Sequence, residues 1–496
     1  MTVLSSATTG QDVLDLAARA AGADRVVPSP SVGPEASAAT NLGPNASLFR
    51  SREIRGLLRP RTADEVRRIV EIHGESAGSG SLHAYSTGGN WGLGSREPAR
   101  DGAVVLDLSG LDRIRELNTD EGWAVVEPGV TQAQLAEALR DTDRMINVTV
   151  SSAHTGVVGN ALDRGVGLRH QRVEDLVGLE VALPNGELVH IGWWPRPDRS
   201  TPVYPYGLGP SLLQTFVQSD LGIVTAAAVR LLPRPEALTV VRLGFAPDTI
   251  AAALDEVRRW VAQGLASGVV KAYNPAAARA YGHTGDDFLL HVCVDGTPES
   301  VSAMTGVVVA AAHASGLFTA VSTTDATDPD APNHEVAVRV ERAYAGDPDR
   351  GDALFEAKMG RPAGRIDPDG GFLFFLPLVP FTGTDLARAV ELLDQVRAET
   401  GIRCGATLNA LNADVVDCVV TMKFDRTDAD ESARAHRALD RVHELFTAQG
   451  YLPYRLDIEH TRYADALAVD PGARELGRRI KAAIDPNQAI APGRYA

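Results

Sequence analysis

The sequence predicts an α+β protein of two domains, the second an antiparallel sheet covered by helices on one face. Three observations carry this prediction. Glycine-rich loops interrupt the strand-like segments of the first half, which is typical of a domain whose backbone approaches a ligand closely. Pro233-Arg234-Pro235 stops the strand-like run at 224–232 and marks a domain boundary. Beyond it, the order strand, helix, strand, strand, helix, strand occurs twice, as in two split halves that share one sheet.

Capping and turn signals define elements of the first domain. Thr62 followed by Glu65, and Thr131 followed by Gln134, have the spacing of a helix capping box, so a helix is predicted after each threonine. Asn185-Gly186 separates two apolar runs, and this pair is a strong signal of a β-hairpin. The sequence therefore places two helices and a hairpin around the glycine-rich loops.

The second domain follows from its alternating and helical apolar patterns. Between its two halves, residues 318–370 are rich in Asp, Pro, Ala and Gly. We expect part of this stretch to be irregular and to form a loop over a ligand site. The strand-like runs are residues 239–245, 269–273, 288–294, 372–379, 404–411, 415–424 and 452–457, and the helical runs are residues 249–262, 298–314, 384–399 and 427–448.

Four parts of the chain are predicted from these boundaries. They are an N-terminal extension at residues 1–48, a first domain at residues 49–236, a second domain at residues 237–456 and a C-terminal segment at residues 457–496. A chain of 496 residues is long enough for two or three domains that each bury a core of their own.

Composition excludes several classes of function. The formal charge of −16 argues against nucleic acid or an anionic membrane as a partner. No apolar run is long enough to span a membrane, and no basic stretch precedes an apolar core near the N-terminus, so we expect neither a membrane span nor a signal peptide. The three cysteines are widely spaced, which suits a reducing cytoplasm and predicts no metal site.

The stretch Ser86-Thr87-Gly88-Gly89-Asn90-Trp91-Gly92-Leu93-Gly94 follows a short strand-like run at residues 82–85. Successive backbone N–H groups in such a loop can form a concave site for phosphate oxygens, and the serine, threonine and asparagine add side-chain donors. No Gly-Lys-Ser/Thr follows, and Gly-x-Gly-x-x-Gly is missing, so this is neither a nucleoside-triphosphate loop nor a Rossmann turn. The loop is predicted to bind phosphate groups by another arrangement.

Three further segments accompany this loop in a fixed order. They are a Gly/Asn-rich stretch at 151–167, a stretch at 209–225 and the ending at 485–495. Together the four segments resemble the vanillyl-alcohol oxidase and 4-cresol dehydrogenase family, whose FAD-binding domain is of the PCMH type. The resemblance implies that the first loop cradles the FAD pyrophosphate, the second lies along the isoalloxazine and ribityl chain, and the third holds the adenine side. It also implies a cap domain over the flavin and a C-terminus that returns to the FAD domain.

The resemblance assigns one set of residues to the cofactor. Arg494 matches the basic residue of the family's ending, where a cation near the flavin N1 or the pyrophosphate stabilises negative charge. The cofactor-binding residues that the resemblance implies are Ser86, Thr87, Gly88, Gly89, Asn90, Trp91, Gly94, Pro128, Ser152, Gly156, Gly159, Asn160, Asp163, Gly165, Gly222, Ile223, Val224 and Arg494.

The resemblance also implies the chemistry. The expected activity is that of an FAD-dependent oxidoreductase, an oxidase or dehydrogenase that passes a hydride from a small organic substrate to flavin N5. Tyr454-Arg455 matches the pair that holds a substrate oxyanion in the family's phenol oxidisers, and an arginine there would bind an anionic oxygen by a charge-assisted hydrogen bond. His154 in the second loop is the nearest candidate base. The substrate is expected to be phenol-, alcohol- or amine-like, with natural-product intermediates among the candidates.

Two positions depart from the family's phenol-oxidising members. Leu93 stands where those enzymes often have a tyrosine, and Ser151 or Ser152 stands where they often have an aspartate. The positions used for covalent attachment of flavin also differ, because Gly89-Asn90 and the Phe372–Phe375 run offer no histidine or tyrosine. We therefore expect FAD to be held without a covalent bond.

Alternatives to an enzyme stay open on the sequence alone. The chain could be a flavin-binding electron-transfer subunit of a larger redox complex, or a non-catalytic protein that binds FAD and uses its cap for interactions. As an enzyme it would need a small-molecule substrate and either O₂ or a redox protein as electron acceptor. A homodimer is compatible with the sequence, and a cytoplasmic location is expected.

Overall fold

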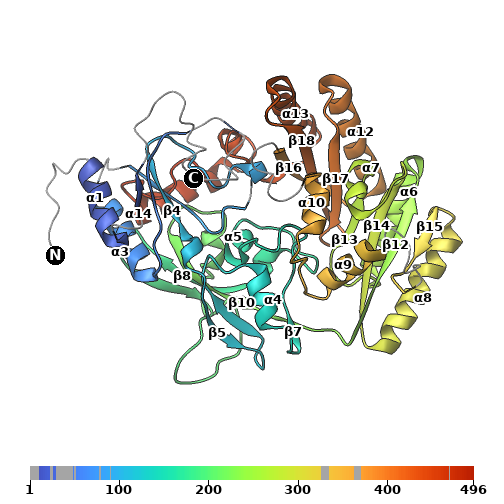
Figure 1. The fold of residues 1–496 in the computed structure, drawn as a ribbon, viewed down its shortest axis with the longest axis horizontal. Helices are drawn as coiled ribbons and strands as arrows, with labels where there is room; N and C mark the ends of the chain where they lie inside the picture. Colours follow the sequence, from blue (N-terminus) through green and yellow to red (C-terminus); the bar gives the residue numbers. More distant parts are fainter. Residues whose placement is uncertain are drawn as a thin grey trace.

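The computed structural model describes residues 10–22, 26–28, 49, 52–76, 80–89, 91–325, 334–361, 370–468 and 470–495. Two lobes lie side by side, and the chain passes from the first to the second and back (Figure 1). The structure combines helices with two multi-stranded sheets in the first lobe and one large sheet in the second, as the α+β prediction requires. No helix of the described residues is long and apolar enough to cross a membrane.

The first lobe is built on two sheets that pack against short helices. One sheet has the strand order β1-β2-β4-β3, in which β4 runs parallel to both of its neighbours, and the other is antiparallel with the order β5-β6-β10-β8-β9. A two-stranded ribbon, β7 with β11, lies beside them. The elements are β1 (Val26–Pro28), β2 (Ile54–Leu58), β3 (Leu82–Tyr85), β4 (Ala103–Asp107), β5 (Ile114–Asn118), β6 (Trp123–Val126), β7 (Arg144–Met145), β8 (Leu176–Ala182), β9 (Leu188–Gly192), β10 (Ile223–Arg230) and β11 (Leu232–Pro233), with α1 (Gly10–Ala21), α3 (Ala63–Glu75), α4 (Gln132–Ala138), α5 (Val157–Leu162) and α14 (Pro471–Ile484).

The local signals of this lobe form as predicted, with one exception. Thr131 and Gln134 make the reciprocal capping box at the start of α4. Thr62 caps α3 by accepting from Glu65 N, but the Glu65 carboxylate accepts from Arg61 N at 2.7 Å and leaves this box half formed. The predicted hairpin is present, since β8 and β9 pair in antiparallel register on either side of the Asn-Gly turn. Sequence spacing therefore identified the helix starts correctly but not the partner of each side chain.

The second lobe is one sheet of eight strands in the order β15-β12-β14-β13-β17-β18-β16-β19, and its named pairs are antiparallel. Helices α6, α8, α12 and α13 cover one face and form the main core with it. Figure 1 shows these helices on the outer side of the lobe. The elements are β12 (Ala237–Phe245), β13 (Val270–Tyr273), β14 (Phe288–Gly296), β15 (Ala320–Ser322), β16 (Gly370–Pro380), β17 (Cys404–Ala410), β18 (Val415–Asp425) and β19 (Pro453–Arg455), with α6 (Ile250–Ala262), α7 (Pro275–Ala278), α8 (Pro298–Ser315), α12 (Gly383–Thr400) and α13 (Ala429–Ala448).

Residues along each cap strand alternate between the helix-covered core and the other face of the sheet. On β18, Val416, Cys418 and Val420 are buried among the helices, whereas Asp417 and Val419 line a cavity on the opposite side. The period of two in a strand produces this division. The face that carries polar residues is therefore the one turned toward the first lobe.

The stretch between the cap halves is more regular than expected. Within residues 318–370 the structure contains β15 and two helices, α9 (His334–Tyr344) and α10 (Ala353–Met359). Residues 326–333 and 362–369 lie outside the described residues. The described part of this stretch reaches the cavity through α10, which lines it with Phe355, Lys358 and Met359.

The segment after the cap completes the first lobe. Leu82 N donates to Ala489 O at 2.6 Å and Ala491 N donates to Leu82 O at 2.7 Å, so residues 489–491 extend the edge of the sheet beside β3. Lys481 fixes this segment by donating to Asp485 Oδ2 at 2.7 Å and to Ile490 O at 2.8 Å. The first lobe is thus built from the chain that precedes the cap in the sequence and from the chain that follows it.

Candidate flavin and substrate site

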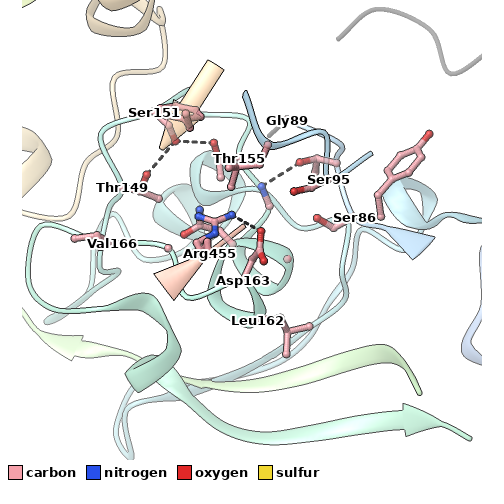
Figure 2. A pocket seen from close by; sticks show the side chains of 18 of the residues that line it. Ser86, Gly89, Ser95, Thr149, Ser151, Thr155, Leu162, Asp163, Val166 and Arg455 are labelled. Atoms are coloured by element: carbon pink, nitrogen blue, oxygen red, sulfur yellow. Dashed lines mark hydrogen bonds and ion pairs between the residues drawn. The ribbon is translucent and has the colours of Figure 1, made fainter. Parts of the chain in front are cut away.

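A cavity of about 360 Å³ lies between the two lobes. The first lobe contributes the turn after β3, the loop before α5 with α5 itself, the loop that enters β10, and the C-terminal segment at residues 490–495. The cap contributes the open face of its sheet together with α10. Figure 2 shows side chains from these separate segments pointing into one space. The four sequence segments predicted to act together therefore meet at a single site.

The glycine-rich turn is shaped for a close-lying ligand. A Cβ placed on Gly89 would meet only Thr87 Oγ1, at 3.9 Å, so this position opens onto the cavity. A Cβ on Gly159 of α5 would lie 2.2 Å from Ser86 Oγ, which only glycine permits. Gly156 N donates to Thr87 Oγ1 at 3.2 Å and joins the turn to the start of α5. Backbone N–H groups of both segments thus border the same open space, as a phosphate-binding loop requires.

Unpaired polar atoms on the cavity wall point to a polar ligand. Asn160 Oδ1 and Arg494 Nη1 are buried and have no hydrogen-bond partner. Both residues line the cavity, and Arg494 is only 7% exposed. A buried acceptor and a buried cation that face open space are costly unless a ligand satisfies them. This pair of groups fits the ribityl hydroxyl groups and the pyrophosphate of FAD.

Most of the residues assigned to the cofactor line the cavity, and a few do not. Gly94 does not line the cavity. A Cβ at this position would lie 2.5 Å from Ile458 Cγ2, so glycine is needed there for packing against the segment that follows the cap. Asn90 lies outside the described residues, and Trp91 begins a short 3₁₀ helix, Trp91–Leu93. Those that line the cavity are Ser86, Thr87, Gly88, Gly89, Pro128, Gly156, Gly159, Asn160, Asp163, Gly165, Gly222, Ile223, Val224 and Arg494.

His154 and Ser152 do not reach the cavity. His154 is exposed, so the structure removes it from the position that a base beside the substrate would occupy. Ser152 Oγ donates to Asp352 Oδ2 at 2.9 Å, and Ala153 N donates to Asp352 Oδ1 at 2.8 Å. Asp352 precedes α10 in the left-handed conformation, with φ of +54°, which aspartate tolerates better than most residues. Ser152 therefore holds the cap helix α10 against the flavin-side loop.

Arg455 lines the cavity but is already engaged. Its guanidinium forms an ion pair with Asp163, and Tyr495 Oη donates to Asp163 Oδ1 at 3.1 Å (Figure 2 shows Arg455 beside Asp163). The side chain is 8% exposed, and its Nε has no partner. Although burial opposes the charge, Asp163 and Tyr454 raise the pKa of Arg455 above its usual value. This arginine is a permanent cation that joins the cap, α5 and the C-terminal segment.

A row of polar side chains crosses the cap sheet toward Tyr454. Lys271, Asn409 and Asp417 occupy directly opposed positions on β13, β17 and β18. Lys271 Nζ donates to Asn409 Oδ1 at 2.5 Å, and Asn409 Nδ2 donates to Asp417 Oδ2 at 3.2 Å. Tyr454 Oη donates to the same carboxylate oxygen at 3.5 Å. All four side chains line the cavity, so the row forms its polar wall on the cap side.

Burial changes the acidity of the groups in this row. It raises the pKa of Asp417 to about 7, against the opposing effect of the Asn409 hydrogen bond and the Lys271 charge. It lowers the pKa of Lys271 to about 7, which Asp417 opposes and Lys358 reinforces. Burial and the Asp417 charge raise the pKa of Tyr454 above its usual value. Tyr454 therefore remains a phenol, while Asp417 and Lys271 can both exchange protons near neutral pH.

Comparison with known sequences shows which kind of domain the first lobe is. Residues 54–192 match the family model described as an FAD binding domain. The chain is 29% identical to the 1'-carboxy-chondrochloren decarboxylase of Chondromyces crocatus, an alignment that covers 91% of this chain and 92% of that one. It is 27% identical to the 4-cresol dehydrogenase [hydroxylating] flavoprotein subunit of Pseudomonas putida, over 87% and 86% of the two chains. Residues 54–192 are thus an FAD-binding domain, and the chain as a whole is similar to FAD-linked oxidoreductases such as 4-cresol dehydrogenase.

Solved structures agree with this fold. The p-cresol methylhydroxylase structure with bound substrate superposes with a TM-score of 0.85 at 24% identity, covering 98% of this chain and 96% of that one. The 4-ethylphenol oxidase of Gulosibacter chungangensis gives the same TM-score of 0.85 at 21% identity and the same coverage. The cavity between the lobes is the candidate site for FAD and substrate in this oxidoreductase.

We predict that this oxidoreductase holds FAD without a covalent bond. The side chains that β16 presents to the cavity are Phe372, Phe374 and Leu376, none of which has a nucleophilic atom that could bond to a flavin. Gly89 likewise offers no side chain. Acid precipitation of the purified protein is expected to leave the yellow colour in the supernatant. Flavin fluorescence that travels with the denatured chain on a gel would contradict this prediction.

Proposed function

We propose that this protein oxidises a small phenol-, alcohol- or amine-like molecule by hydride transfer to its flavin. The observation that carries the proposal is the presence of Tyr454, Asp417 and Arg455 together on the cap side of the cavity. FAD supplies the hydride acceptor when it is bound. The remaining task of the protein is to orient the substrate and to accept a proton from its ionisable group.

The row of polar side chains can perform the proton transfer. A substrate hydroxyl next to Tyr454 Oη can pass its proton to that oxygen as the phenol proton moves to Asp417 Oδ2. Asp417 suits this role because burial places its pKa near 7. The permanent charge of Arg455 favours negative charge on the substrate oxygen, even though Asp163 already neutralises part of its effect. An electron-rich substrate then loses a hydride more readily.

The relatives support a substrate of this kind without fixing it. Two of the similar proteins are named for phenols, 4-cresol and 4-ethylphenol, and one is named for a carboxylated compound. Leu93 stands in the cavity wall where the phenol-oxidising members often have a tyrosine, and Ser151 stands there without an acidic group. We therefore propose a substrate class that includes phenols and is wider than 4-alkylphenols.

Flavin reduction under anaerobic stopped flow tests the proposal. A panel of 4-alkylphenols, benzylic alcohols and benzylic amines is mixed with the yellow holoprotein, and at least one member is expected to bleach it. With that substrate, Tyr454→Phe should slow flavin reduction by about 10²–10³-fold, the usual effect of removing a donor that stabilises a developing oxyanion. Tyr204→Phe is a matched control, because Tyr204 is 57% exposed and outside the cavity lining.

Two outcomes would count against the proposal. Equal reduction rates for the Tyr454→Phe protein and the wild type would remove Tyr454 from the reaction. A holoprotein that no member of a broad panel reduces, but that exchanges electrons with a redox protein, would favour the electron-transfer alternative. Reoxidation of the reduced protein by O₂, compared with reoxidation by a mediator dye, then distinguishes an oxidase from a dehydrogenase.

A further inference from the structure

Lysine is rare in this chain, and its positions are informative. Only four of the 48 lysine and arginine residues are lysine, so arginine supplies nearly all surface cations. Lys481 is buried in the first lobe, where its ammonium donates to three acceptors, Asp220 O, Asp485 Oδ2 and Ile490 O. Lys271 and Lys358 both line the cavity between the lobes. Half of the lysines therefore lie at the proposed substrate site.

The two cavity lysines have unused hydrogen-bonding capacity. Lys271 is 7% exposed, and Asn409 Oδ1 accepts one of its three N–H groups. For Lys358 Nζ, the interaction recorded among the described residues is with the face of the Phe374 ring, 5.9 Å from the ring centroid. An ammonium removed from bulk water is costly unless an acceptor replaces its hydration. Both side chains are therefore prepared for an additional acceptor in the cavity.

The charges that line the described cavity do not balance. Its carboxylates are Asp163, which is paired with Arg455, and Asp417, which Lys271 reaches through Asn409. Arg494 belongs to the flavin side, where its unpaired nitrogen suits the cofactor. The ammonium of Lys358 is then left without an anionic partner among the lining residues. A bound anion on the cap side would complete the balance.

The surroundings of Lys358 indicate which kind of anion fits. Phe355, Phe372, Phe374 and Met359 line the same part of the cavity, and these side chains favour an apolar or aromatic body. Lysine presents a compact point charge with rotatable donors and suits a single carboxylate group. An apolar molecule with one terminal carboxylate matches this combination of an aromatic wall and an ammonium.

We propose that Lys271 and Lys358 form an anion subsite on the cap side and that the substrate is an apolar or aromatic carboxylic acid. The inference deepens the proposed function and rests on it for the assignment of this cavity as the substrate site. The carboxylate lies against the two ammonium groups, which leaves the ionisable group near Tyr454 free to react. Because Asp163 neutralises Arg455, the substrate carboxylate is recognised by Lys271 and Lys358 and not by Arg455.

Equilibrium binding to the oxidised holoprotein tests the subsite without turnover. The probes are 4-hydroxyphenylacetate and its neutral isostere 4-hydroxyphenylacetamide, each titrated while the flavin absorbance spectrum is followed. The acid is expected to bind at least tenfold more tightly than the amide, and Lys358→Met should reduce that ratio to about one. Lys271→Met should reduce it as well, while Arg230→Met serves as a control because Arg230 is exposed and outside the lining.

The pH dependence of the affinity for the acid provides a second test of the subsite. Burial, with the Lys423 charge, lowers the pKa of Lys358 to about 8, and Lys358 in turn lowers the pKa of Lys271. Tyr281 of the short helix Arg279–Tyr281, which packs against α10, is a further titratable group of the lining. Because a neutral amine cannot attract a carboxylate, acid affinity should fall as pH rises through about 7, where Lys271 loses its proton, and fall again through about 8, where Lys358 does. Lys358→Arg should keep the fall near 7 and lose the one near 8, since guanidinium stays protonated.

The outcomes separate the subsite from the proposed function. Equal affinities for acid and amide, or an acid preference that survives both lysine substitutions, would overturn the subsite. Flavin reduction by neutral phenols without any preference for acids would uphold the proposed function and overturn the subsite. An acid preference that Lys358→Met abolishes would uphold the subsite even if no member of the panel reduces the flavin.

Discussion

Replacing Gly89 with valine is expected to give a folded protein that binds no flavin. The position opens onto the cavity, because a Cβ there meets no atom of the protein closer than Thr87 Oγ1 at 3.9 Å. A valine side chain therefore fits without a clash in the apo protein and fills the space along which the cofactor would lie. The protein should purify colourless, while the wild type is yellow.

Absorbance at the flavin band, relative to protein absorbance, measures the occupancy. Circular dichroism and the thermal unfolding midpoint of the apo forms establish that the variant is folded. Gly306→Val is the matched control, because Gly306 is an exposed helical glycine with open space around it and no part in the cavity. Full flavin occupancy in the Gly89→Val protein would show that this turn does not hold the cofactor.

Replacing Arg455 with alanine is expected to destabilise the protein by about 3 kcal/mol, near the lower end of the range for breaking a buried ion pair. Asp163 would remain in the cavity wall at 14% exposure with its main cationic partner gone. Tyr495 still donates to this carboxylate, but a phenol does not replace a full positive charge. Urea unfolding of the holoprotein, followed by tryptophan fluorescence and flavin release, measures the loss.

A second substitution shows whether the carboxylate that has lost its cation is the cause. Adding Asp163→Asn to the Arg455→Ala protein should recover part of the lost stability, because the buried negative charge is then removed together with the positive one. The surface pair Arg441–Glu399, with side chains 32% and 39% exposed, provides the comparison, and Arg441→Ala should cost only about 0.2–1 kcal/mol. If Arg455→Ala and Arg441→Ala lower the free energy of unfolding by similar amounts, the Arg455–Asp163 ion pair does not stabilise the contact between the lobes.

The flavin side of the site was predictable because its signals are local in the sequence. The turn at residues 86–89 is recognisable from its consecutive glycines, and it lines the cavity as expected. Gly156 and Gly159 were identified in the same way. Each of these positions is marked by its own residue type and immediate neighbours, so spacing along the chain was sufficient to place it at the cavity.

The cap side of the site depends on information that spacing does not contain. Lys271, Asn409 and Asp417 become neighbours only through the register of three strands, and a shift of one residue would turn each to the opposite face. The orientation of a loop side chain is equally invisible, which is why His154 was a candidate base although it points to solvent. The scarcity of lysine was the one sequence signal for Lys271 and Lys358.

The pairing of residues 489–491 with Leu82 has a consequence for biosynthesis. Asn487 Nδ2 donates to Gly74 O across a separation of 413 positions, and Ala491 N donates to Leu82 O nearby. When the cap has left the ribosome during translation, residues 489–491, which pair beside β3, and Arg494 have therefore not yet emerged. The cap can fold as a unit during translation, whereas the first lobe must wait for residues 489–494. Flavin binding is therefore expected to need these residues, and nascent chains arrested before residue 489 should emerge with a folded cap and no flavin.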